Sequence, residues 1–257
     1  MFRSVYTLCA AVVVAAIAAC KPFPKAANEY PAGHVVHEAA KGYLSISGAC
    51  GLISWMGSAF VVEVNGVSMG LGNGLTAAHN LWYMCGDIGE VMAETHTGAK
   101  FKVNAVGYEK ETDIGVIYSP SYPGMKPLSL GNSDDLKLGQ MLYGLCTTVW
   151  NPSVIPYGPL IAKDITDYYT DLEVTLTGLM TFDGARHPQG CSGGPVLTED
   201  GKVVGVMSGI PTITVTNFEA GRGAVSTYEE QRGREIYFVP INTALEAMRR
   251  IVAKNGH

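Results

Sequence analysis

Short segments rich in β-branched and aromatic residues follow one another from Gly42 towards the C-terminus, separated by glycine, asparagine and aspartate turn signals. Each segment has about five to nine residues, a length typical of strands in an all-β domain. Asp200 and Gly201 lie between two such segments and predict a hairpin. The predicted strands are residues 60–64, 101–106, 114–118, 140–145, 172–180, 202–208 and 236–241.

Only the last part of the chain has the periodicity of a helix. Apolar residues recur there on one face of a segment that opens at Asn242, and basic residues lie near its end, where the helix dipole favours cations. The apolar positions are Leu245, Met248, Ile251 and Val252. The pattern therefore predicts an all-β domain followed by a C-terminal α-helix.

The first residues have the pattern of an export signal. Arg3 precedes sixteen uncharged residues, 4–19, and this stretch is shorter than the roughly 20 residues that a membrane-spanning helix needs. It ends in Ile-Ala-Ala-Cys, which resembles the bacterial lipobox. We therefore expect residues 1–19 to be a lipoprotein-type signal peptide and Cys20 to be lipidated, so that the chain is anchored to a membrane of the cell envelope. Ordinary cleavage near Ala18 or Ala19 and an uncleaved anchor are the alternatives.

Residues 20–43 are rich in proline, alanine and lysine without clear periodicity, and are expected to form a tether. The chain as a whole has 257 residues, 47% of them apolar, which excludes a disordered protein. Its formal net charge is −5 and no run of lysine or arginine occurs. Nucleic acid is therefore not expected as a partner, because the basic surface that phosphate backbones require is missing.

The cysteines are compatible with disulfides rather than with a metal site. Cys9 and Cys20 belong to the export region, and the four that remain can pair in three ways. Their spacings match no zinc pattern, so neither a metal nor another cofactor is expected. These four cysteines are Cys50, Cys85, Cys146 and Cys191.

Three short strings carry candidate chemistry: LTAAHN at 75–80, ETDIGVIYS at 111–119 and QGCSGGPV at 189–196. They supply His79, Asp113 and Ser192. Acyl transfer needs a nucleophile, a base within hydrogen-bond reach and a carboxylate that orients the base. Gly190 precedes the serine, and its flexible backbone could direct its own N–H and that of Ser192 towards one developing oxyanion.

In this order, with separations of 34 and 79 residues, the three strings resemble those of the trypsin-like serine peptidases of the chymotrypsin clan. Segment 57–62 is similar to the family's strand before the histidine loop, and segments 130–146, 195–209 and 237–248 are similar to bacterial high-temperature-requirement peptidases. The resemblance covers residues 44–254. It implies two packed six-stranded antiparallel β-barrels, at about 44–130 and 138–241, closed by a helix over 242–254, without a peptide-recognition module of the PDZ type.

The resemblance also implies the role of each site residue. His79 would take the proton of Ser192, and Asp113 would hold the imidazole. Ser208 would support the aspartate, with an ordinary strand serine as the alternative. The resemblance places Arg186, His187 and Met207 near the wall of the specificity pocket. For Arg186 and His187, the simpler interpretation is that they are solvated loop residues. The chain is thus expected to be an exported serine endopeptidase acting on protein or peptide substrates. The alternative is an inactive envelope lipoprotein that binds peptides on the same scaffold.

Cys191 departs from the family pattern. It occupies the position of an aspartate that, in the digestive enzymes, pairs with a newly freed N-terminal amine, so activation by that ion pair is not expected. Cys191 could compete as the nucleophile, or be buried, either free or bonded to Cys146. The digestive relatives imply a disulfide between Cys50 and Cys85, which leaves Cys146 and Cys191. Residues 209–234 are expected to form a loop beside the substrate cleft.

Overall fold

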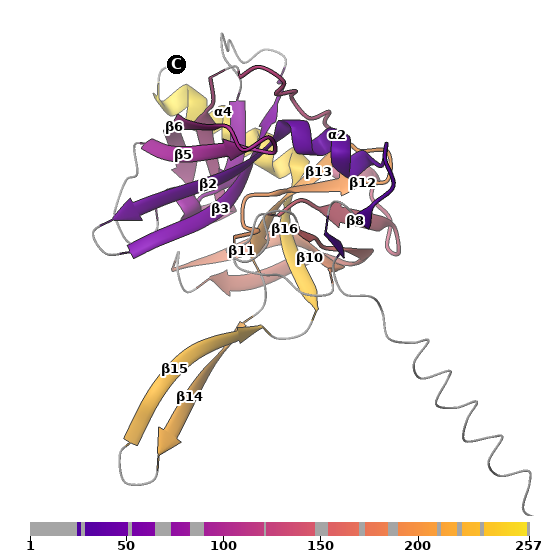
Figure 1. The fold of residues 1–257 in the computed structure, drawn as a ribbon. Helices are drawn as coiled ribbons and strands as arrows, with labels where there is room; N and C mark the ends of the chain where they lie inside the picture. Colours follow the sequence, from indigo (N-terminus) through magenta and orange to yellow (C-terminus); the bar gives the residue numbers. More distant parts are fainter. Residues whose placement is uncertain are drawn as a thin grey trace, which may run out of the picture.

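The structure, a computed structural model, contains mostly strands, with one long helix near the C-terminus (Figure 1). It describes residues 25–26, 29–50, 53–64, 73–82, 90–120, 122–146, 154–169, 173–184, 190–209, 212–219, 223–231 and 234–255.

The first barrel closes in the strand order β2-β3-β4-β7-β6-β5, with every neighbouring pair antiparallel. Alternate residues point into it, and the interior includes Leu44, Ile46, Val61 and Ile117. The six strands are β2 (Tyr43–Cys50), β3 (Ile53–Val62), β4 (Asn73–Ala77), β5 (Glu90–Thr95), β6 (Lys100–Glu109) and β7 (Ile114–Tyr118).

The second barrel closes in the order β10-β11-β16-β13-β12-β8. The expected hairpin at Asp200 and Gly201 joins β12 to β13, and Gly201 has the positive φ of 79° that such turns require. These strands are β8 (Met141–Gly144), β10 (Tyr157–Tyr169), β11 (Val174–Asp183), β12 (Pro195–Thr198), β13 (Val203–Gly209) and β16 (Glu235–Pro240). The predicted fold class, two six-stranded antiparallel barrels with a C-terminal helix, is confirmed.

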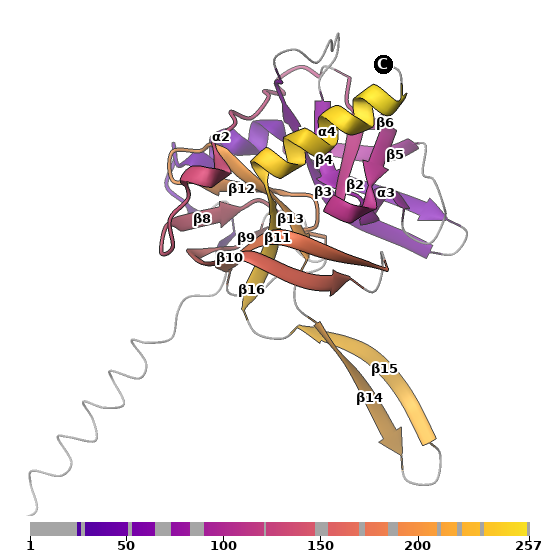
Figure 2. The ribbon, with the colours of Figure 1, turned by 180° about the vertical axis from the view of Figure 1, so that it is seen from behind.

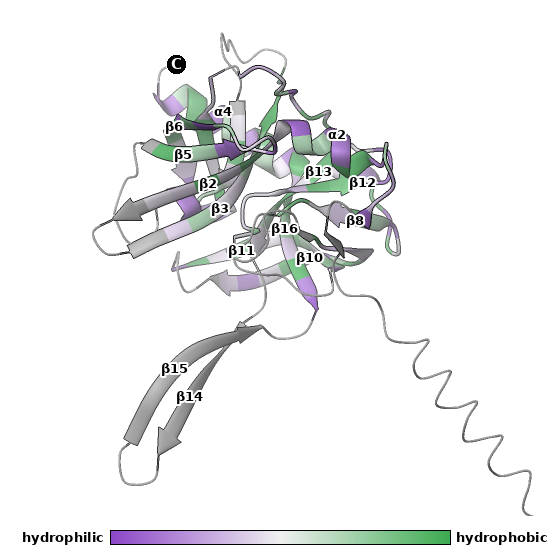
Figure 3. Cartoon of the chain, viewed as in Figure 1, coloured by the Kyte–Doolittle hydropathy of each residue, from purple (hydrophilic) through white to green (hydrophobic). Residues whose placement is uncertain are grey.

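A shared apolar cluster joins the two barrels. It contains Phe60, Leu75 and Val116 of the first barrel and Leu197 and Val203 of the second. The helix α4 (Ile241–Asn255) packs the face predicted from its periodicity against the same cluster. The view from behind shows α4 lying in front of the strands (Figure 2). Figure 3 shows hydrophobic residues along β12 and β13, which are buried throughout almost their whole length. The barrels are therefore fixed relative to each other by a continuous core.

The segment before β2 corrects the expectation of a tether over residues 20–43. There the helix α2 (Val35–Ala39) is followed by the 3₁₀ turn η2 (Ala40–Gly42), and Val36 and Ala39 are buried in the core that joins the barrels. Further upstream, β1 (Lys25–Ala26) pairs with β9 (Val154–Ile155). Val36 and Ala39 form the buried face of this helix.

The predicted signal peptide and Cys20 lie outside the described residues. Within the part of the chain that the structure describes, no helix has the length and apolar character needed to cross a membrane.

Residues 209–234 also differ from the expected loop. They contain a regular antiparallel hairpin of β14 (Thr212–Glu219) and β15 (Gly223–Gln231), which extends away from the barrels in both views (Figures 1 and 2). The β-branched run Thr-Ile-Thr-Val-Thr in β14 explains why this segment adopts a strand.

Candidate active site

His79 and Asp113 are brought together by the ends of two paired strands of the first barrel. His79 opens the short helix α3 (His79–Trp82) directly after β4, and Asp113 lies between the 3₁₀ turn η3 (Lys110–Thr112) and β7. The Ala78 N–H donates to the Asp113 carbonyl at 3.0 Å, and the His79 N–H donates to Asp113 Oδ1 at 3.1 Å. These backbone contacts fix the aspartate against the start of α3.

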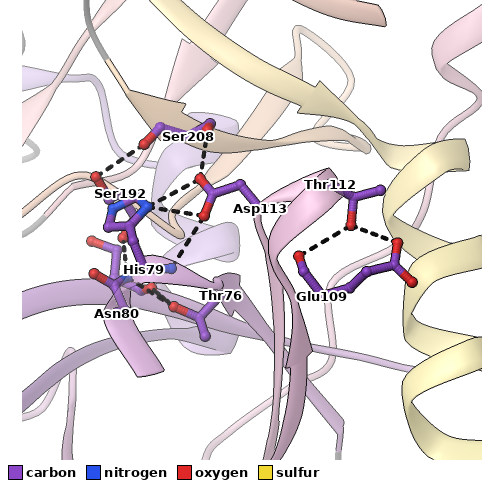
Figure 4. A network of polar contacts seen from close by, with 9 residues as sticks. Thr76, His79, Asn80, Glu109, Thr112, Asp113, Ser192 and Ser208 are labelled. Atoms are coloured by element: carbon purple, nitrogen blue, oxygen red, sulfur yellow. Dashed lines mark hydrogen bonds and ion pairs between the residues drawn. The ribbon is translucent and has the colours of Figure 1, made fainter. Parts of the chain in front are cut away.

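The two side chains also meet directly. His79 Nδ1 lies 3.0 Å from both carboxylate oxygens of Asp113 (Figure 4). Asp113 is fully buried, whereas 18% of the His79 side chain is exposed. An ionised carboxylate can only accept hydrogen bonds, so this contact favours the tautomer with the proton on Nδ1 and leaves Nε2 as an acceptor.

Asp113 adopts a left-handed backbone conformation, with φ 52° and ψ 38°. Aspartate and asparagine tolerate this region better than other residues with a side chain. The η3 turn that sets the conformation is tied down on both sides: Lys110 Nζ lies 3.1 Å from the centre of the Trp82 ring, and Arg250 of α4 binds Glu109. The Arg250 guanidinium lowers the pKa of Glu109 from its ordinary value. The aspartate is thus positioned by its own turn and by α4.

Ser208 links Asp113 to Ser192. Its hydroxyl donates to Asp113 Oδ2 at 2.5 Å, and its backbone carbonyl accepts a hydrogen bond from Ser192 Oγ at 3.2 Å (Figure 4). Ser208 itself is buried, while Ser192 is partly exposed. The structure therefore brings together the four residues His79, Asp113, Ser192 and Ser208, which the sequence supplies from three separate strings and from β13.

The backbone carbonyls of residues 190, 191 and 192 each accept a hydrogen bond. Ser58 Oγ donates to the Gly190 carbonyl at 2.7 Å, the Gly194 N–H donates to the Cys191 carbonyl at 2.9 Å, and the Ser192 carbonyl accepts from the Ser58 N–H and Asn80 Nδ2, each at 2.8 Å. In a trans peptide the N–H points opposite to the C=O. Fixing the Cys191 carbonyl therefore fixes the direction of the Ser192 N–H.

Neither the Gly190 nor the Ser192 N–H donates to a protein acceptor among the described residues. Gly190 has a φ of 104°, in the region that glycine adopts without strain. Both N–H groups that the sequence nominates for an oxyanion site are therefore available for a ligand atom.

The glycines after Ser192 permit a close approach of the two barrels. A Cβ on Gly193, whose φ is +86°, would lie 2.1 Å from the Ser58 carbonyl oxygen and 2.3 Å from Thr76 Oγ1. A Cβ on Gly194 would lie 2.2 Å from the Leu145 carbonyl oxygen. A side chain at position 193 would clash with the first barrel, and one at position 194 would clash with the residue that follows β8 in the second barrel, so the Ser-Gly-Gly string is a packing requirement as well as a turn signal.

A disulfide between Cys146 and Cys191 ties the Ser192 turn to the end of β8, with a Cα–Cα distance of 4.4 Å. Of the two readings left open for a buried Cys191, free or bonded to Cys146, the structure has the bonded one. A bonded sulfur carries no thiolate, which removes the argument for Cys191 as the nucleophile. The predicted disulfide between Cys50 and Cys85 stays a prediction, because Cys85 and the side chain of Cys50 lie outside the described part of the chain.

Of the three predicted specificity residues, the structure describes only Met207. Arg186 and His187 lie outside the described residues, and their role stays a prediction. Met207 is fully buried in the core of the second barrel, and its backbone bonds Gly193 and Gly194. Its observed contacts are therefore those of a residue supporting the turn.

Sequence reasoning missed Ser58, Asn80 and Tyr43. Ser58 and Asn80 hold the Ser192 turn from the first barrel, and the Tyr43 hydroxyl lies 2.7 Å from Ser58 Oγ. The only available signals were the position of Asn80 directly after His79 and of Ser58 in the GSAFVV string. Neither signal indicates a partner more than one hundred residues away.

Known proteins share this architecture. Over 125 residues the chain is 32% identical to a probable periplasmic serine endoprotease, DegP-like, of Chlamydia pneumoniae, and over 123 residues it is 28% identical to the serine protease PepD of Mycobacterium tuberculosis. These matches cover 48% and 47% of this chain but only 24% and 26% of the relatives. The chain thus matches about a quarter of the length of these curated relatives.

Solved structures agree on the fold. The HtrA-type protease AlgW with a tripeptide superposes with a TM-score of 0.64 at 20% identity, over 85% of this chain and 62% of that one. A serine endoprotease from Yersinia pestis gives 0.61 at 16% identity, over 88% and 68%. The trypsin-like peptidase domain matches residues 57–206, a span that contains Ser58, His79, Asp113 and Ser192. The chain belongs to the trypsin-like peptidase domain family.

Proposed function

We propose that this protein is a serine endopeptidase that cleaves protein or peptide substrates through Ser192, His79 and Asp113. One observation carries the proposal: the buried carboxylate of Asp113 binds His79 Nδ1 and the Ser208 hydroxyl, while the Ser208 carbonyl binds Ser192 Oγ. A nucleophile, a base and an orienting carboxylate thus occupy one continuous network, as acyl transfer requires.

The first step is attack by Ser192 on the scissile carbonyl. The Ser192 hydroxyl turns from the Ser208 carbonyl towards His79 Nε2, and its proton passes to that nitrogen as the Oγ–carbon bond forms. The carbonyl oxygen becomes an oxyanion, which the N–H groups of Gly190 and Ser192 bind. The imidazolium formed on His79 is stabilised by the adjacent Asp113 carboxylate, whose charge is poorly screened because it is buried.

The second step breaks the peptide bond. His79 gives its proton to the leaving amine, the carbon–nitrogen bond breaks, and an acyl ester on Ser192 remains. A water molecule then repeats the sequence: His79 takes its proton, the water oxygen attacks the ester carbonyl, and the proton returns to Ser192 Oγ as the acid product leaves. No oxidant, reductant or cofactor is consumed in this cycle.

We further propose that the domain works outside the cytoplasm, anchored through a lipid on Cys20. The DegP-like relatives are named as periplasmic, and a disulfide beside the nucleophile suits an oxidising compartment. Mass spectrometry of the mature N-terminus tests this point. A diacylated Cys20 in the membrane fraction, released by Cys20→Ser, would support it, and an unmodified N-terminus at another residue would contradict it.

Substitution of the nucleophile tests the central proposal. Ser192→Ala should retain the fold and lose hydrolysis of denatured casein by roughly a million-fold, as expected for a triad that acts as a unit. Ser119→Ala is the control, because it removes a different serine hydroxyl of the domain, one that is buried and contacts neither His79 nor Asp113 in the described structure. Equal casein turnover by Ser192→Ala and Ser119→Ala would refute the assignment.

A further inference from the structure

The two bonded cysteines lie at one end of the pairing between β8 and β12. At this end the Leu145 N–H donates to the Pro195 carbonyl at 3.1 Å. The chain just before Pro195 forms a turn, in which the Gly194 N–H donates to the Cys191 carbonyl at 2.9 Å. This turn brings Cys191 next to Cys146, the residue after Leu145. Both cysteines belong to the core of the second barrel, so that barrel alone brings them together.

The disulfide ties down the peptide group that carries the Ser192 N–H, one of the two proposed oxyanion donors. The carbonyl of this group is that of Cys191, and its donor, Gly194, belongs to the same turn. That hydrogen bond closes the turn on itself, and one to water can replace it at a small cost in free energy. The disulfide joins Cys191 to Cys146, two residues after β8, and so attaches this peptide group to the barrel. The direction of the Ser192 N–H therefore depends on the covalent bond.

The folded second barrel shields this bond from solvent. Cys146 is 2% exposed and Cys191 is 0% exposed, and Cys146 Sγ lies 4.0 Å from Sδ of the buried Met207. Thiol–disulfide exchange requires a thiolate to reach one of the two sulfurs. A reductant therefore reaches the bond only after the barrel has opened, so a disulfide that has formed persists in the folded enzyme. For the same reason, the free thiols must meet an oxidant before the turn closes over them.

We propose that Cys146 and Cys191 are an oxidation site, and that conversion of their thiols to the disulfide activates the peptidase. This inference rests on the proposed function. The oxidant is a disulfide, carried by a protein or by a small molecule. One cysteine thiolate attacks it, forms a mixed disulfide and releases one thiol of the oxidant. The other cysteine thiolate attacks the enzyme sulfur of the mixed disulfide, which forms the Cys146–Cys191 bond and releases the second thiol. Two electrons and two protons pass from the cysteine pair to the oxidant.

The consequence is activation by compartment. In a reducing compartment the chain would keep both thiols, and the Ser192 N–H would have no fixed direction for an oxyanion. In an oxidising compartment the bond forms and the oxyanion site is completed. Because the bond is buried, this activation runs in one direction as long as the enzyme stays folded.

The test compares the reduced and the oxidised full chain. Protein unfolded in urea and dithiothreitol is refolded either in dithiothreitol or in oxidised glutathione, and peptide mapping verifies the bond. We expect kcat on a peptide from denatured casein to be about a hundredfold higher after oxidation, with KM nearly unchanged, as for the gain of one oxyanion donor. Dithiothreitol added to the oxidised enzyme without urea should leave kcat unchanged, because the bond is buried. A reduced chain without the native circular dichroism spectrum overturns the proposal, since the bond would then serve the fold.

Variants assign the effect to this cysteine pair. The double variant Cys146→Ala/Cys191→Ala should have the kcat of the reduced wild type under both conditions. Cys50→Ser/Cys85→Ser is the matched control, because it removes the other two cysteines of the domain, and it should keep the hundredfold gain on oxidation. Reduced and oxidised wild type with kcat values within a factor of three, or a gain on oxidation that persists in Cys146→Ala/Cys191→Ala, overturns the proposal. Failure of the oxidised wild type to hydrolyse casein overturns the proposed function instead.

Discussion

Ser58→Ala removes one hydroxyl from the first barrel and acts on the Ser192 turn of the second. The Gly190 carbonyl can only accept, so Ser58 Oγ donates to it at 2.7 Å, and the Tyr43 hydroxyl is then the donor to Ser58. The Ser58 N–H, which holds the Ser192 carbonyl at 2.8 Å, is unchanged by the substitution. The variant therefore loosens the Gly190 end of the turn and spares the Ser192 end.

The size of the effect follows from the bond that is lost. A buried neutral hydrogen bond contributes about 1 kcal/mol, which corresponds to about fivefold in rate if it acts only in the transition state. Complete loss of one oxyanion donor costs about 10² to 10³ in kcat and sets the upper limit. We therefore expect kcat to fall about five- to tenfold with KM nearly unchanged, because the contact orients the turn and does not touch the substrate.

Steady-state hydrolysis of a single-site peptide separates kcat from KM. Ser119→Ala serves as the control for loss of a buried hydroxyl and should keep the wild-type kcat. The affinity for a peptide boronate, measured for the same variants, should weaken only in Ser58→Ala. Tyr43→Phe should give a smaller loss in kcat, since Ser58 keeps its bond to Gly190. A kcat for Ser58→Ala within a factor of two of wild type, or an equal loss in Ser119→Ala, would refute the reasoning.

Three further predictions concern the surroundings of the site. Asp113→Asn should keep the left-handed turn, which asparagine tolerates, yet lower kcat by about 10⁴ through the wrong histidine tautomer; turnover near wild type, with the fold checked by circular dichroism, would contradict it. Reduction of the Cys146–Cys191 bond, verified by thiol alkylation, should lower kcat because the turn loses its tie to β8; unchanged turnover of fully reduced enzyme would count against this role. Arg250→Ala should lower the Tm near pH 7, because Glu109 loses the partner that lowers its pKa. A carboxyl with a lowered pKa in the folded state stabilises the fold while it is ionised, so the Tm difference from wild type should shrink as the pH falls below 4.5 through the pKa of Glu109. A Tm difference that stays constant down to pH 2 would exclude the Arg250–Glu109 ion pair as its cause.

Local strings predicted most of the fold. The strand at 114–118 coincides with β7, and the Asp200–Gly201 turn forms the expected hairpin, because both depend on alternation and turn chemistry within a few residues. The helix α2 was missed because its apolar residues are few and lie in a segment rich in proline and alanine. The strand β14 was missed because a strand far from a core lacks the burial that makes alternation informative.

The candidate site likewise contains residues that local sequence identifies and contacts that only the tertiary structure reveals. Small residues surround His79 and Ser192, and an apolar strand follows Asp113, so short strings identify all three. The contacts of Ser58 with Gly190 and of Asn80 with Ser192 join residues 132 and 112 positions apart. Such contacts depend on how the two barrels pack, and only tertiary structure supplies that information.

Covalent labelling tests the central claim most directly. The full chain is treated with a fluorophosphonate probe, and the modified residue is identified by mass spectrometry, with His79→Ala and Ser119→Ala treated in parallel. We expect a single adduct on Ser192 in the wild type and in Ser119→Ala, and we expect it to form at least a hundredfold more slowly in His79→Ala because the base is missing. Peptide hydrolysis that persists in the wild type without any adduct on Ser192 would contradict it.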